Sequence, residues 1–338
     1  MSMGAEQCGI NIRYAVEADS KAAATFQANH PGVKVINKDI RTVALSEFTG
    51  INRHQPLIVF GGPPCQGFST SNQKNRDAEN ENNWLYREFI RVVQGTQPDW
   101  IVFENVKGLI ETESGYFLEK VLAELKRLGF TNSHFVLNSA DYGVPQTRNR
   151  LFIIGSRNGI EVTPPPPFNK RVTVRQAIAD LPVLENGATS DLSLYSGPAR
   201  TEFARAMRRK LRQCHNNIVT NNAPHIVERY SHIPPGGNWE SIPAFLMENY
   251  KDVTRCHTGI YKRLHPDMPS VVIGNFRKNM LIHPWHHRGL SVREAARLQS
   301  FPDSFRFYGS IGFQQQQVGN AVPPKLAEAV FRQIISHT

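Results

Sequence analysis

The sequence predicts an α/β protein built on a doubly wound, mostly parallel sheet, and three features support this fold class. Short runs rich in branched apolar residues, such as 56–60 and 99–106, have the length and composition of buried strands. Amphipathic segments such as 115–130 lie between these runs and have the spacing of helices. Strands that alternate with helices indicate βαβ units. The alternation is lost after Ser156, so we expect a second, smaller and irregular domain there.

The other elements of the first half follow from local signals. A short helix closes on Gly9, and a strand is expected within 11–19. A helix then begins at Ser20 and ends before the Pro-Gly pair at 31–32. A strand is expected within 33–40. These elements continue the same alternation of helix and strand.

Two further elements flank the strand 99–106. The segment 82–98 is expected to be an amphipathic helix, because its apolar residues fall on one face. The run 150–157 is rich in branched apolar residues and is expected to be a strand. Both extend the α/β pattern.

The second half contains fewer regular elements. The proline-rich stretch 163–168 is typical of a linker, and the chain over 181–284 is irregular. A basic helix is expected over 202–213. Ser291 opens a further helix with a capping box that it forms with Glu294. The chain ends with a tight turn and a helix that begins with proline.

Composition and charge narrow the class of protein. Of the 338 residues, 40% are hydrophobic and 20% are charged, which is typical of a soluble globular protein. No apolar run is long enough to span a bilayer, and the first residues lack the pattern of a secretory signal. The formal net charge of +10 suits a polyanionic partner such as nucleic acid. The four cysteines form no disulfide framework, which indicates a reducing cytoplasm; they are Cys8, Cys65, Cys214 and Cys256.

Four stretches with polar or reactive side chains lie at strand ends or in turns: PPCQGFS at 63–69, ENV at 104–106, QTRNR at 146–150 and VGNAVPP at 318–324. In this order, and with REAARLQSFPD at 293–303 between the last two, they resemble the DNA cytosine-5 methyltransferases over nearly the whole chain. The resemblance implies a Rossmann-like methyltransferase fold, S-adenosyl-L-methionine as the cofactor, and double-stranded DNA as the substrate. It also implies a bacterial or phage protein that acts as a monomer on DNA in the cytoplasm, at the nucleoid.

Cys65 follows the strand 56–60, behind two prolines, at the edge of the sheet where α/β folds bind their ligands. Taken alone, it would be interpreted as a small apolar residue in a tight loop. In the family's chemistry it is the nucleophile, whose thiolate attacks C6 of a flipped-out cytosine so that C5 can accept a methyl group. A free thiol has a pKa of about 8.5, so the site should supply positive potential.

Arg148 and Arg150 alternate along an extended segment and so share one face, which makes them candidates for that potential and for substrate contacts. Glu104 ends the strand 99–106, where its carboxyl group can bond N3 and the amine of cytosine; a raised pKa would let it donate a proton. Without the cysteine, these three residues would be interpreted as an ordinary strand-end carboxylate and a solvated edge. Asn105 is expected to brace the cysteine loop. Further candidates for substrate and loop support are Gln66, Ser69 and Gln146.

The cofactor site is inferred from position together with the resemblance. Glu17 ends a strand at a place where an acidic residue can bind ribose hydroxyls. The family places a carboxylate such as Asp39 near the adenine amine, with Ile40 against the ring. Leu85 matches a position near the cofactor, and Asn320 lies in the turn that closes the pocket. The expected cofactor contacts also include Ala18, Pro64 and Val322.

One feature of the family is not found in this sequence. Its members open with a strand and a glycine-rich turn that holds the methionine part of the cofactor, whereas this chain begins with what looks like the next helix. Loss of a central strand would leave the backbone groups of its neighbours unpaired. Three explanations are open: a start site placed too late, a truncated gene, or a piece supplied by another chain. The activity of the chain as given is therefore an open question.

The resemblance also predicts two domains. A catalytic and cofactor-binding domain is expected over 1–180 and 310–338, and a small DNA target-recognition domain over 181–309. The basic helix 202–213 either holds phosphates or is a solvated face. The loop 231–239 has the glycines and the aromatic residue of a segment that approaches nucleic acid, although such loops also simply turn corners.

Two alternatives to a DNA methyltransferase remain. One is a tRNA cytosine-5 methyltransferase, which shares the chemistry. The other is a catalytically inactive DNA-binding or regulatory subunit that lacks the donor site. Either a cognate restriction endonuclease or a solitary role is compatible with the sequence. No metal is expected, because the Cys-His pairs at 214–215 and 256–257 match no common zinc spacing.

Overall fold

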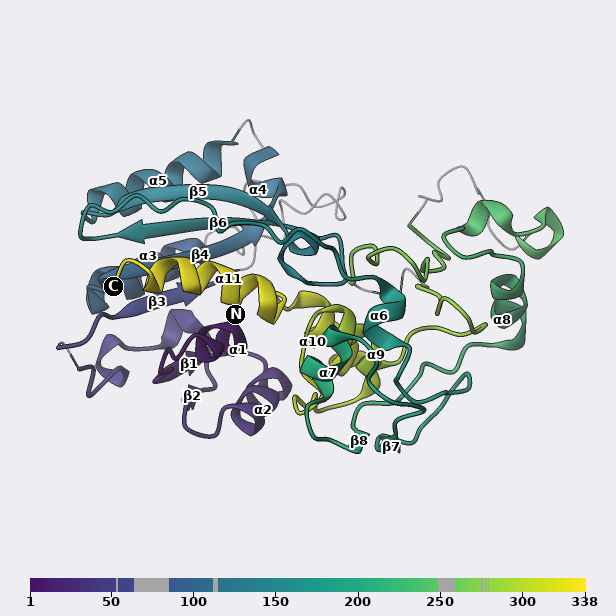
Figure 1. Cartoon of the computed structure of the whole chain (residues 1–338). Coiled ribbons are helices and arrows are strands. Elements are labelled where there is room, and N and C mark those ends of the chain that lie inside the picture. The colour runs from purple at the N-terminus through teal and green to yellow at the C-terminus, as the bar shows by residue number, and fades with distance from the viewer. Residues whose placement is uncertain are drawn as a thin grey trace.

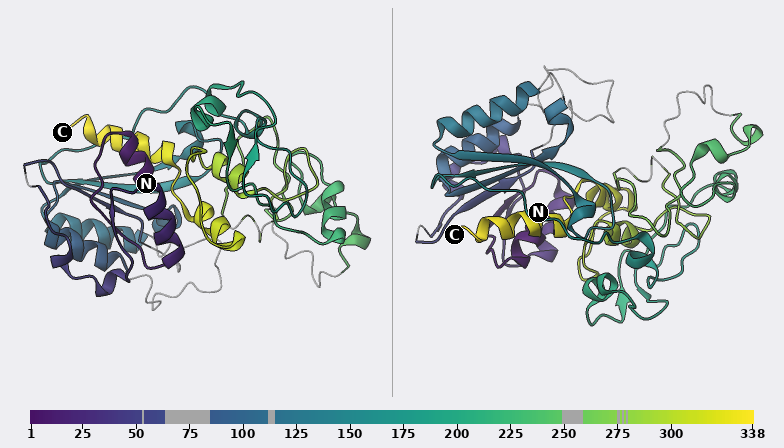
Figure 2. Two further views of the ribbon diagram at one scale, coloured as in Figure 1. Left: turned by 90° about the horizontal axis from the view of Figure 1, so that it is seen from below. Right: turned by 45° about the horizontal axis from the view of Figure 1, so that its top comes forward.

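The computed structural model shows a lobe with a central sheet and a second lobe of short helices and irregular chain, which lie side by side (Figure 1; Figure 2). From α1 to β4, helices and strands alternate along the chain, as the sequence predicts. The residues that the structure describes are 1–52, 54–63, 85–111, 115–248, 259–274, 276, 278 and 280–338. Cys65 and its neighbours at 64–84 lie outside them.

The main sheet has the strand order β3-β4-β6-β5, formed by Ile58–Gly61, Trp100–Val106, Asn149–Ser156 and Thr131–Asn138. β3 and β4 pair in parallel, whereas β6 pairs antiparallel with both β4 and β5. It follows that β3, β4 and β5 run in one direction and only β6 runs against them. This arrangement confirms the predicted α/β class with a mostly parallel sheet.

A second, two-stranded parallel sheet is formed by β1 (Tyr14–Val16) and β2 (Lys34–Ile36), with Val16 opposite Ile36. The crossover helix α2 (Ser20–Asn29) joins them and begins at Ser20, as predicted, with Asp19 as its N-cap. The Asp19 carboxylate accepts hydrogen bonds from the first backbone N–H groups of α2. In the described part of the chain, β1 pairs only with β2, and β3 pairs only with β4.

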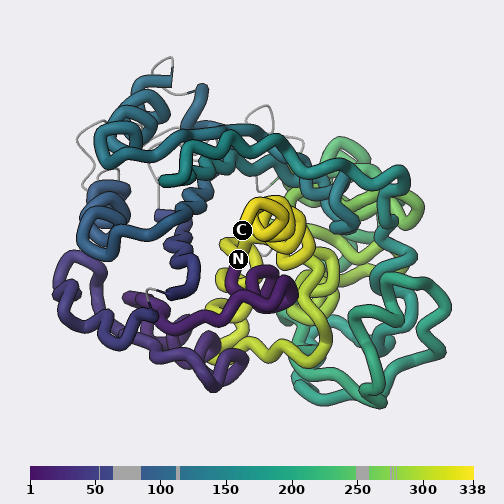
Figure 3. Tube along the Cα trace, turned by 60° about the vertical axis from the view of Figure 1, so that its left-hand side comes forward, coloured from purple at the N-terminus to yellow at the C-terminus, as the bar shows by residue number. Residues whose placement is uncertain are grey.

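Helices cover both faces of the main sheet, and β4 shows this most clearly. Its alternate residues Ile101 and Phe103 join the core beneath α3 (Leu85–Thr96) and α5 (Tyr116–Arg127). Trp100 and Val102 join the opposite core, beneath α1 (Ser2–Gln7) and α11 (Pro324–Ile335). The N-terminal helix α1 lies beside the C-terminal helix α11 (Figure 3). Because both faces are covered, the sheet is doubly wound, as the sequence predicts.

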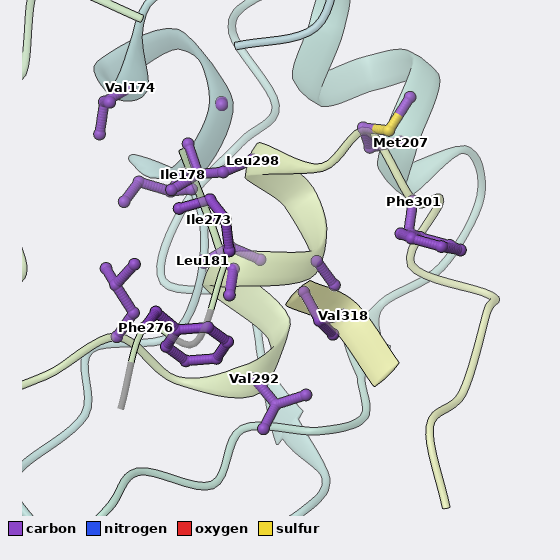
Figure 4. Packing of buried hydrophobic residues seen from close by; sticks show 14 of the residues in the cluster. Val174, Ile178, Leu181, Met207, Ile273, Phe276, Val292, Leu298, Phe301 and Val318 are labelled. Carbon is purple, nitrogen blue, oxygen red and sulfur yellow. The ribbon is translucent and has the colours of Figure 1, made fainter. Parts of the chain in front are cut away.

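The second lobe is centred on a cluster of buried apolar residues between α6, α7, α9 and α10 (Figure 4). These helices span Val174–Ile178, Glu202–Arg208, Val292–Leu298 and Ile311–Asn320. The predicted capping box of Ser291 and Glu294 is confirmed at the start of α9. A smaller core forms beneath α8 (Pro224–Ser231). The remaining helix and strands are α4 (Gly108–Glu111), β7 (Ser193–Leu194) and β8 (Gln213–Cys214).

Three elements differ from the predictions. β5 was not predicted, because its residues are mostly polar or only half-buried at the sheet edge. α10 was also not predicted, because its glutamines mask the apolar face that Val318 contributes. The basic helix predicted over 202–213 is wrong beyond Arg208, because Arg209 adopts a positive φ of 52° that stops the helix. No helix in the described ranges is both long and apolar enough to cross a membrane.

Candidate active site

Glu104 and Arg150 form an ion pair at the end of the central strands. In the antiparallel pair β4–β6, Glu104 lies opposite Phe152, and Arg150 lies two residues further along the same face. The Nε of Arg150 lies 2.9 Å from Oε1 of Glu104, and the two side chains are 14% and 11% exposed. A carboxyl group and a guanidinium are thus in contact at the carboxyl end of β4. This is the edge of the sheet where α/β folds place their ligands.

Burial makes the carboxyl group of this pair harder to ionise than that of a free glutamate. Burial raises the pKa of Glu104, and the positive charges of Arg150 and Arg148 oppose this shift without cancelling it. Burial also lowers the pKa of the Arg150 guanidinium, which the carboxylate raises in turn. A buried carboxyl group that retains its proton can donate it to a ring nitrogen.

Gly62 and Pro63 bring the start of the cysteine loop against this pair. A Cβ atom on Gly62 would lie only 2.5 Å from Oε2 of Glu104, so a larger residue there would force the carboxylate or the backbone to shift. The Nδ2 of Asn105 donates a 3.1 Å hydrogen bond to the carbonyl of Pro63. The last described residue in contact with this strand end is therefore Pro63, which precedes Cys65 by two positions. The importance of Gly62 was missed in the sequence, although the paired glycines at 61–62 were its signal.

Arg148 behaves differently from Arg150. Its side chain is 2% exposed, and its two Nη atoms donate to the carbonyls of Ile273 (3.1 Å) and Gly319 (2.9 Å). Burial and the charge of Arg150 lower the pKa of Arg148 to about 9. The expectation that both arginines turn one face to the substrate therefore needs revision, because the described contacts of Arg148 are with backbone carbonyls of the second lobe.

Gln146, predicted as a supporting residue, is fully buried in the same region. Its Oε1 accepts from the backbone N–H of Ile273 at 2.7 Å, and its Nε2 donates to Oε1 of Gln299 at 2.8 Å. It contacts the second lobe in the way that Arg148 does. The other predicted loop residues Pro64, Cys65, Gln66 and Ser69 lie outside the described residues.

The predicted adenosine contacts lie at the carboxyl ends of β1 and β2. Glu17 follows β1 and Asp39 lies beyond β2, and the parallel register brings the two strand ends to one edge. The guanidinium and backbone N–H of Arg41 lower the pKa of Asp39 to about 2, so this carboxylate stays ionised. Two carboxylates at one edge are suitable acceptors for ribose hydroxyls and an adenine amine, so this end of the site fits the adenosine part of the cofactor.

The remaining predicted cofactor residues differ in how far they are buried. Ile40 is half-buried, and its carbonyl accepts a hydrogen bond from Arg91 of α3. Leu85 is the half-buried first residue of α3, and Ala18 is exposed after β1. Asn320 is the exposed last residue of α10, whereas Val322 is buried in the core beneath α11.

Comparison with known proteins decides the family. Residues 1–336 match the family model described as C-5 cytosine-specific DNA methylase. The chain belongs to this family. It is 37% identical over 338 residues to the Type II methyltransferase M1.HphI of Haemophilus parahaemolyticus, covering 99% of this chain and 83% of that protein. It is 32% identical to M.DdeI of Desulfomicrobium norvegicum, covering 98% and 85%.

Solved structures agree on the fold. A DNA modification methyltransferase encoded within an E. coli prophage superposes with a TM-score of 0.80 at 24% identity, covering 99% of this chain and 95% of that one. Spodoptera frugiperda DNMT2 gives a TM-score of 0.63 at 14% identity, covering 99% and 96%. The protein is thus a DNA (cytosine-5) methyltransferase, which uses S-adenosylmethionine as the methyl donor and double-stranded DNA as the substrate.

The candidate metal ligands of the sequence give no cluster in the structure. Among the described residues, no group of three or more histidine, cysteine, aspartate or glutamate side chains is placed to hold a metal ion. Cys214 is buried, and its thiol contacts the side-chain amide of Asn217. Cys256 and His257 lie outside the described residues.

Proposed function

We propose that the Glu104–Arg150 pair binds and activates the target cytosine and that Cys65 is the nucleophile. The observation that supports this most strongly is the position of Gly62 directly beneath the Glu104 carboxylate. Because Asn105 also bonds to Pro63, the start of the cysteine loop is fixed against the acid. An acid, a cation and the two residues that lead toward Cys65 therefore lie together at one strand end.

The reaction follows from the chemistry of these groups. The Cys65 thiolate forms a bond to C6, and the electron pair of the C5–C6 double bond is displaced toward C5 and N3. Glu104 donates its proton to N3 and so neutralises the charge that develops there. S-adenosylmethionine, when bound, supplies an electrophilic methyl group to C5. The C5 proton then passes to water, and its electron pair restores the C5–C6 double bond as the thiolate leaves C6. N3 returns its proton to Glu104, so that the acid is regenerated.

The charges around Glu104 suit the thiolate. Arg148 and Arg150 contribute two guanidinium groups, whereas a protonated Glu104 contributes no charge. A nearby cation lowers the pKa of a thiol and raises the fraction of the reactive form. In our proposal Arg150 also contacts the substrate, while Arg148 supplies charge from its buried position.

We further propose that the carboxyl ends of β1 and β2 hold the donor. Glu17 accepts from the ribose hydroxyls, Asp39 accepts from the adenine amine, and Ile40 packs on the ring. The backbone turn at Glu17 is supported by Asp19, whose N–H donates to the Glu17 carboxylate at 2.9 Å. The other proposed contacts are Ala18, Pro64, Leu85, Asn320 and Val322.

DNA recognition falls to the second lobe in this proposal. A cytosine within a duplex cannot reach Cys65, so it is flipped out at a cost of a few kcal/mol. The proposed division places 1–180 and 310–338 in the catalytic domain and 181–309 in the recognition domain. Helices α6 and α10 pack in the same core as α9, so the recognition core extends back to Val174 and forward to Val318. We also propose a cognate restriction endonuclease as partner and a place at the nucleoid of a bacterial cell. The relatives are bacterial Type II methyltransferases, which is compatible with this.

Methylation of unmethylated bacterial genomic DNA tests this proposal. The full chain, supplied with S-adenosylmethionine, is incubated with the DNA, which is then digested and its nucleosides separated by mass. We expect 5-methyldeoxycytidine from the wild type and none from Cys65→Ala. Methyl groups on N4 of cytosine or on adenine would refute the proposal, as would full activity of Cys65→Ala.

A second candidate function is supported by the split sheet. β1 and β3 lie in separate sheets, and each pairs with one strand only in the described residues. Such a chain would bind DNA as a regulatory subunit without a complete donor site. Retained DNA binding with no methyl transfer, and no gain on adding cell extract that contains a complementing chain, would favour this role.

A further inference from the structure

We propose that Gln146, Arg148 and Gln299 form a buried polar junction that positions Arg150 and couples it to the recognition lobe. The proposal rests on the proposed function of the Glu104–Arg150 pair and concerns what holds that pair in place. All three junction side chains are buried. They connect the chain just before β6 with the segment 270–274 and with the ends of α9 and α10.

The segment 270–274 runs beside the residues that lead into β6. Ser270 forms a parallel bridge with Gln146. The backbone N–H of Ser270 donates to the carbonyl of Pro145, and that of Thr147 donates to the carbonyl of Ser270, both at 2.9 Å. The recognition lobe therefore adds an extended segment directly to the approach to the active-site strand.

Side chains then fix this segment at its far end. Gln146 accepts from the N–H of Ile273, and Arg148 donates to its carbonyl, so the segment just before β6 holds both backbone groups of one residue. Gln299 donates from Nε2 to the carbonyl of Val318 at 2.7 Å and accepts from Gln146. Each amide uses both its oxygen and its nitrogen, which fixes its orientation.

The backbones of Gly319 and Gly274 are in close contact at this junction. A Cβ atom on Gly319 would lie 2.2 Å from the carbonyl oxygen of Gly274. Gly319 also accepts the hydrogen bond from Arg148. The last turn of α10 therefore touches the backbone of the segment 270–274 while Arg148 bonds to both.

Burial of the Arg148 guanidinium carries a large desolvation cost. Removing a guanidinium from water costs several kcal/mol unless its donors are satisfied. The buried Arg297 is paired with the carboxylates of Asp303 and Asp180. In the described residues, Arg148 bonds to two carbonyls, and its buried Nε has no partner. A neutral side chain would hold the segment at lower cost, so the buried charge indicates a role beyond packing.

That role follows from the connection to Arg150. The carbonyl of Arg148 accepts from both the N–H and the Oγ of Ser139, at 2.9 and 2.8 Å, which anchors the backbone on the catalytic side. Arg150 lies two residues further on, on the same strand as the pair with Glu104. A displacement of the segment 270–274 by bound DNA would pass through Arg148 to Arg150. Arg148 is thus a positioning residue.

Exchange of hydrogen at C5 provides a test that needs no methyl donor. When the thiolate adds to C6, C5 takes up a proton from water, and elimination then releases the hydrogen originally bound there. The rate of tritium release from genomic DNA labelled with [5-³H]cytosine therefore reports the adduct step alone. DNA affinity and melting temperature are measured on the same full-length variants.

We compare Arg148→Met and Arg148→Lys with Arg157→Met as the matched control. Arg157 follows the other end of β6, where its guanidinium also donates to a carbonyl, that of Pro98. For Arg148→Met we expect tritium release to fall about 100-fold, as for a misplaced catalytic group, with DNA affinity within about threefold of the wild type. Arg148→Lys should recover at least tenfold, whereas Arg157→Met should release tritium at the wild-type rate.

Gly319→Ala is the second route to the same junction, in case Arg148→Met does not fold. It keeps every hydrogen-bonding side chain but forces the Gly274 backbone away, and we expect the same loss of rate at retained DNA affinity. The inference is overturned if the loss in both junction variants only follows a loss of DNA affinity or of melting temperature. If the wild type itself releases no tritium, it is the proposed function that fails.

Discussion

The guanidinium of Arg150 contacts the carboxylate of Glu104 at 2.9 Å, across the antiparallel strands β4 and β6. The pair lies at the carboxyl end of β4, and the glycine beneath it leads within three residues to Cys65. Burial raises the pKa of the carboxyl group despite the ion pair. The carboxyl group of Glu104 and the guanidinium of Arg150 therefore lie together at the place where we propose that the cytosine reacts.

Replacement of Glu104 by glutamine removes the proton donor but keeps the shape of the side chain. We expect methyl transfer by Glu104→Gln to fall by about 10²- to 10⁴-fold, because general acid catalysis typically contributes that much. DNA affinity should change little. The matched control is Glu124→Gln on α5, where the carboxylate pairs with Arg127. Wild-type rates in Glu104→Gln would show that another group protonates the base.

The raised pKa of Glu104 also predicts how stability depends on pH. The folded protein binds this proton more tightly than the unfolded chain, whose glutamate has a pKa of about 4.3. The contribution is therefore fully present below that value and is lost as pH rises through the folded pKa. Relative to Glu104→Gln, the melting temperature of the wild type should fall as the pH is raised above about 4.3, the pKa of the unfolded glutamate. The opposite slope would mean that the ion pair with Arg150 outweighs burial.

Gly62→Ala tests the close approach of the cysteine loop to the acid. The added methyl group would lie 2.5 Å from the Glu104 carboxylate, so the loop or the acid must move. We expect activity to fall at least about 100-fold. Gly197→Ala is the matched control, because nothing lies within 4 Å of a Cβ atom there. Equal activity of the two variants would remove the loop from the site.

Asp39 provides a test of the donor site that is independent of DNA. Asp39→Asn replaces an ionised acceptor with an amide that presents donors to the adenine amine. We expect the dissociation constant of S-adenosylhomocysteine, measured by calorimetry, to rise about tenfold with DNA affinity unchanged. Glu119→Gln on the exposed face of α5 should leave both constants at their wild-type values. An unchanged affinity for S-adenosylhomocysteine in Asp39→Asn would move the adenine elsewhere.

The strands that build the active site could be predicted because burial leaves a strong signal. β4 and β6 are covered on both faces, so their residues are almost all apolar and appear as unbroken runs in the sequence. β5 carries no such run, since it pairs with β6 at the sheet edge and only one of its eight residues, Leu137, is buried. Helix α10 was hidden in the same way by buried glutamines that bond within the second lobe.

The site itself could be predicted only as a set of residues. Sequence order places Glu104 and Arg150 at strand ends, but their contact depends on the antiparallel reversal of β6, which no local pattern shows. Alternation predicts a shared face for Arg148 and Arg150. That prediction does not allow for Arg148 preceding the strand, where the segment 270–274 takes its side chain. Contacts between segments more than 100 residues apart are set by packing.

Peptide mapping of a trapped complex tests the central claim most directly. The full chain is incubated with S-adenosylmethionine and DNA that contains 5-fluorocytosine, whose C5 has no proton to lose, so the adduct persists. After digestion with trypsin and nuclease, we expect the nucleotide on the peptide that carries Cys65 and on no peptide with Cys8, Cys214 or Cys256. Methylation at C5 without such an adduct, or an adduct on another residue, would contradict the account.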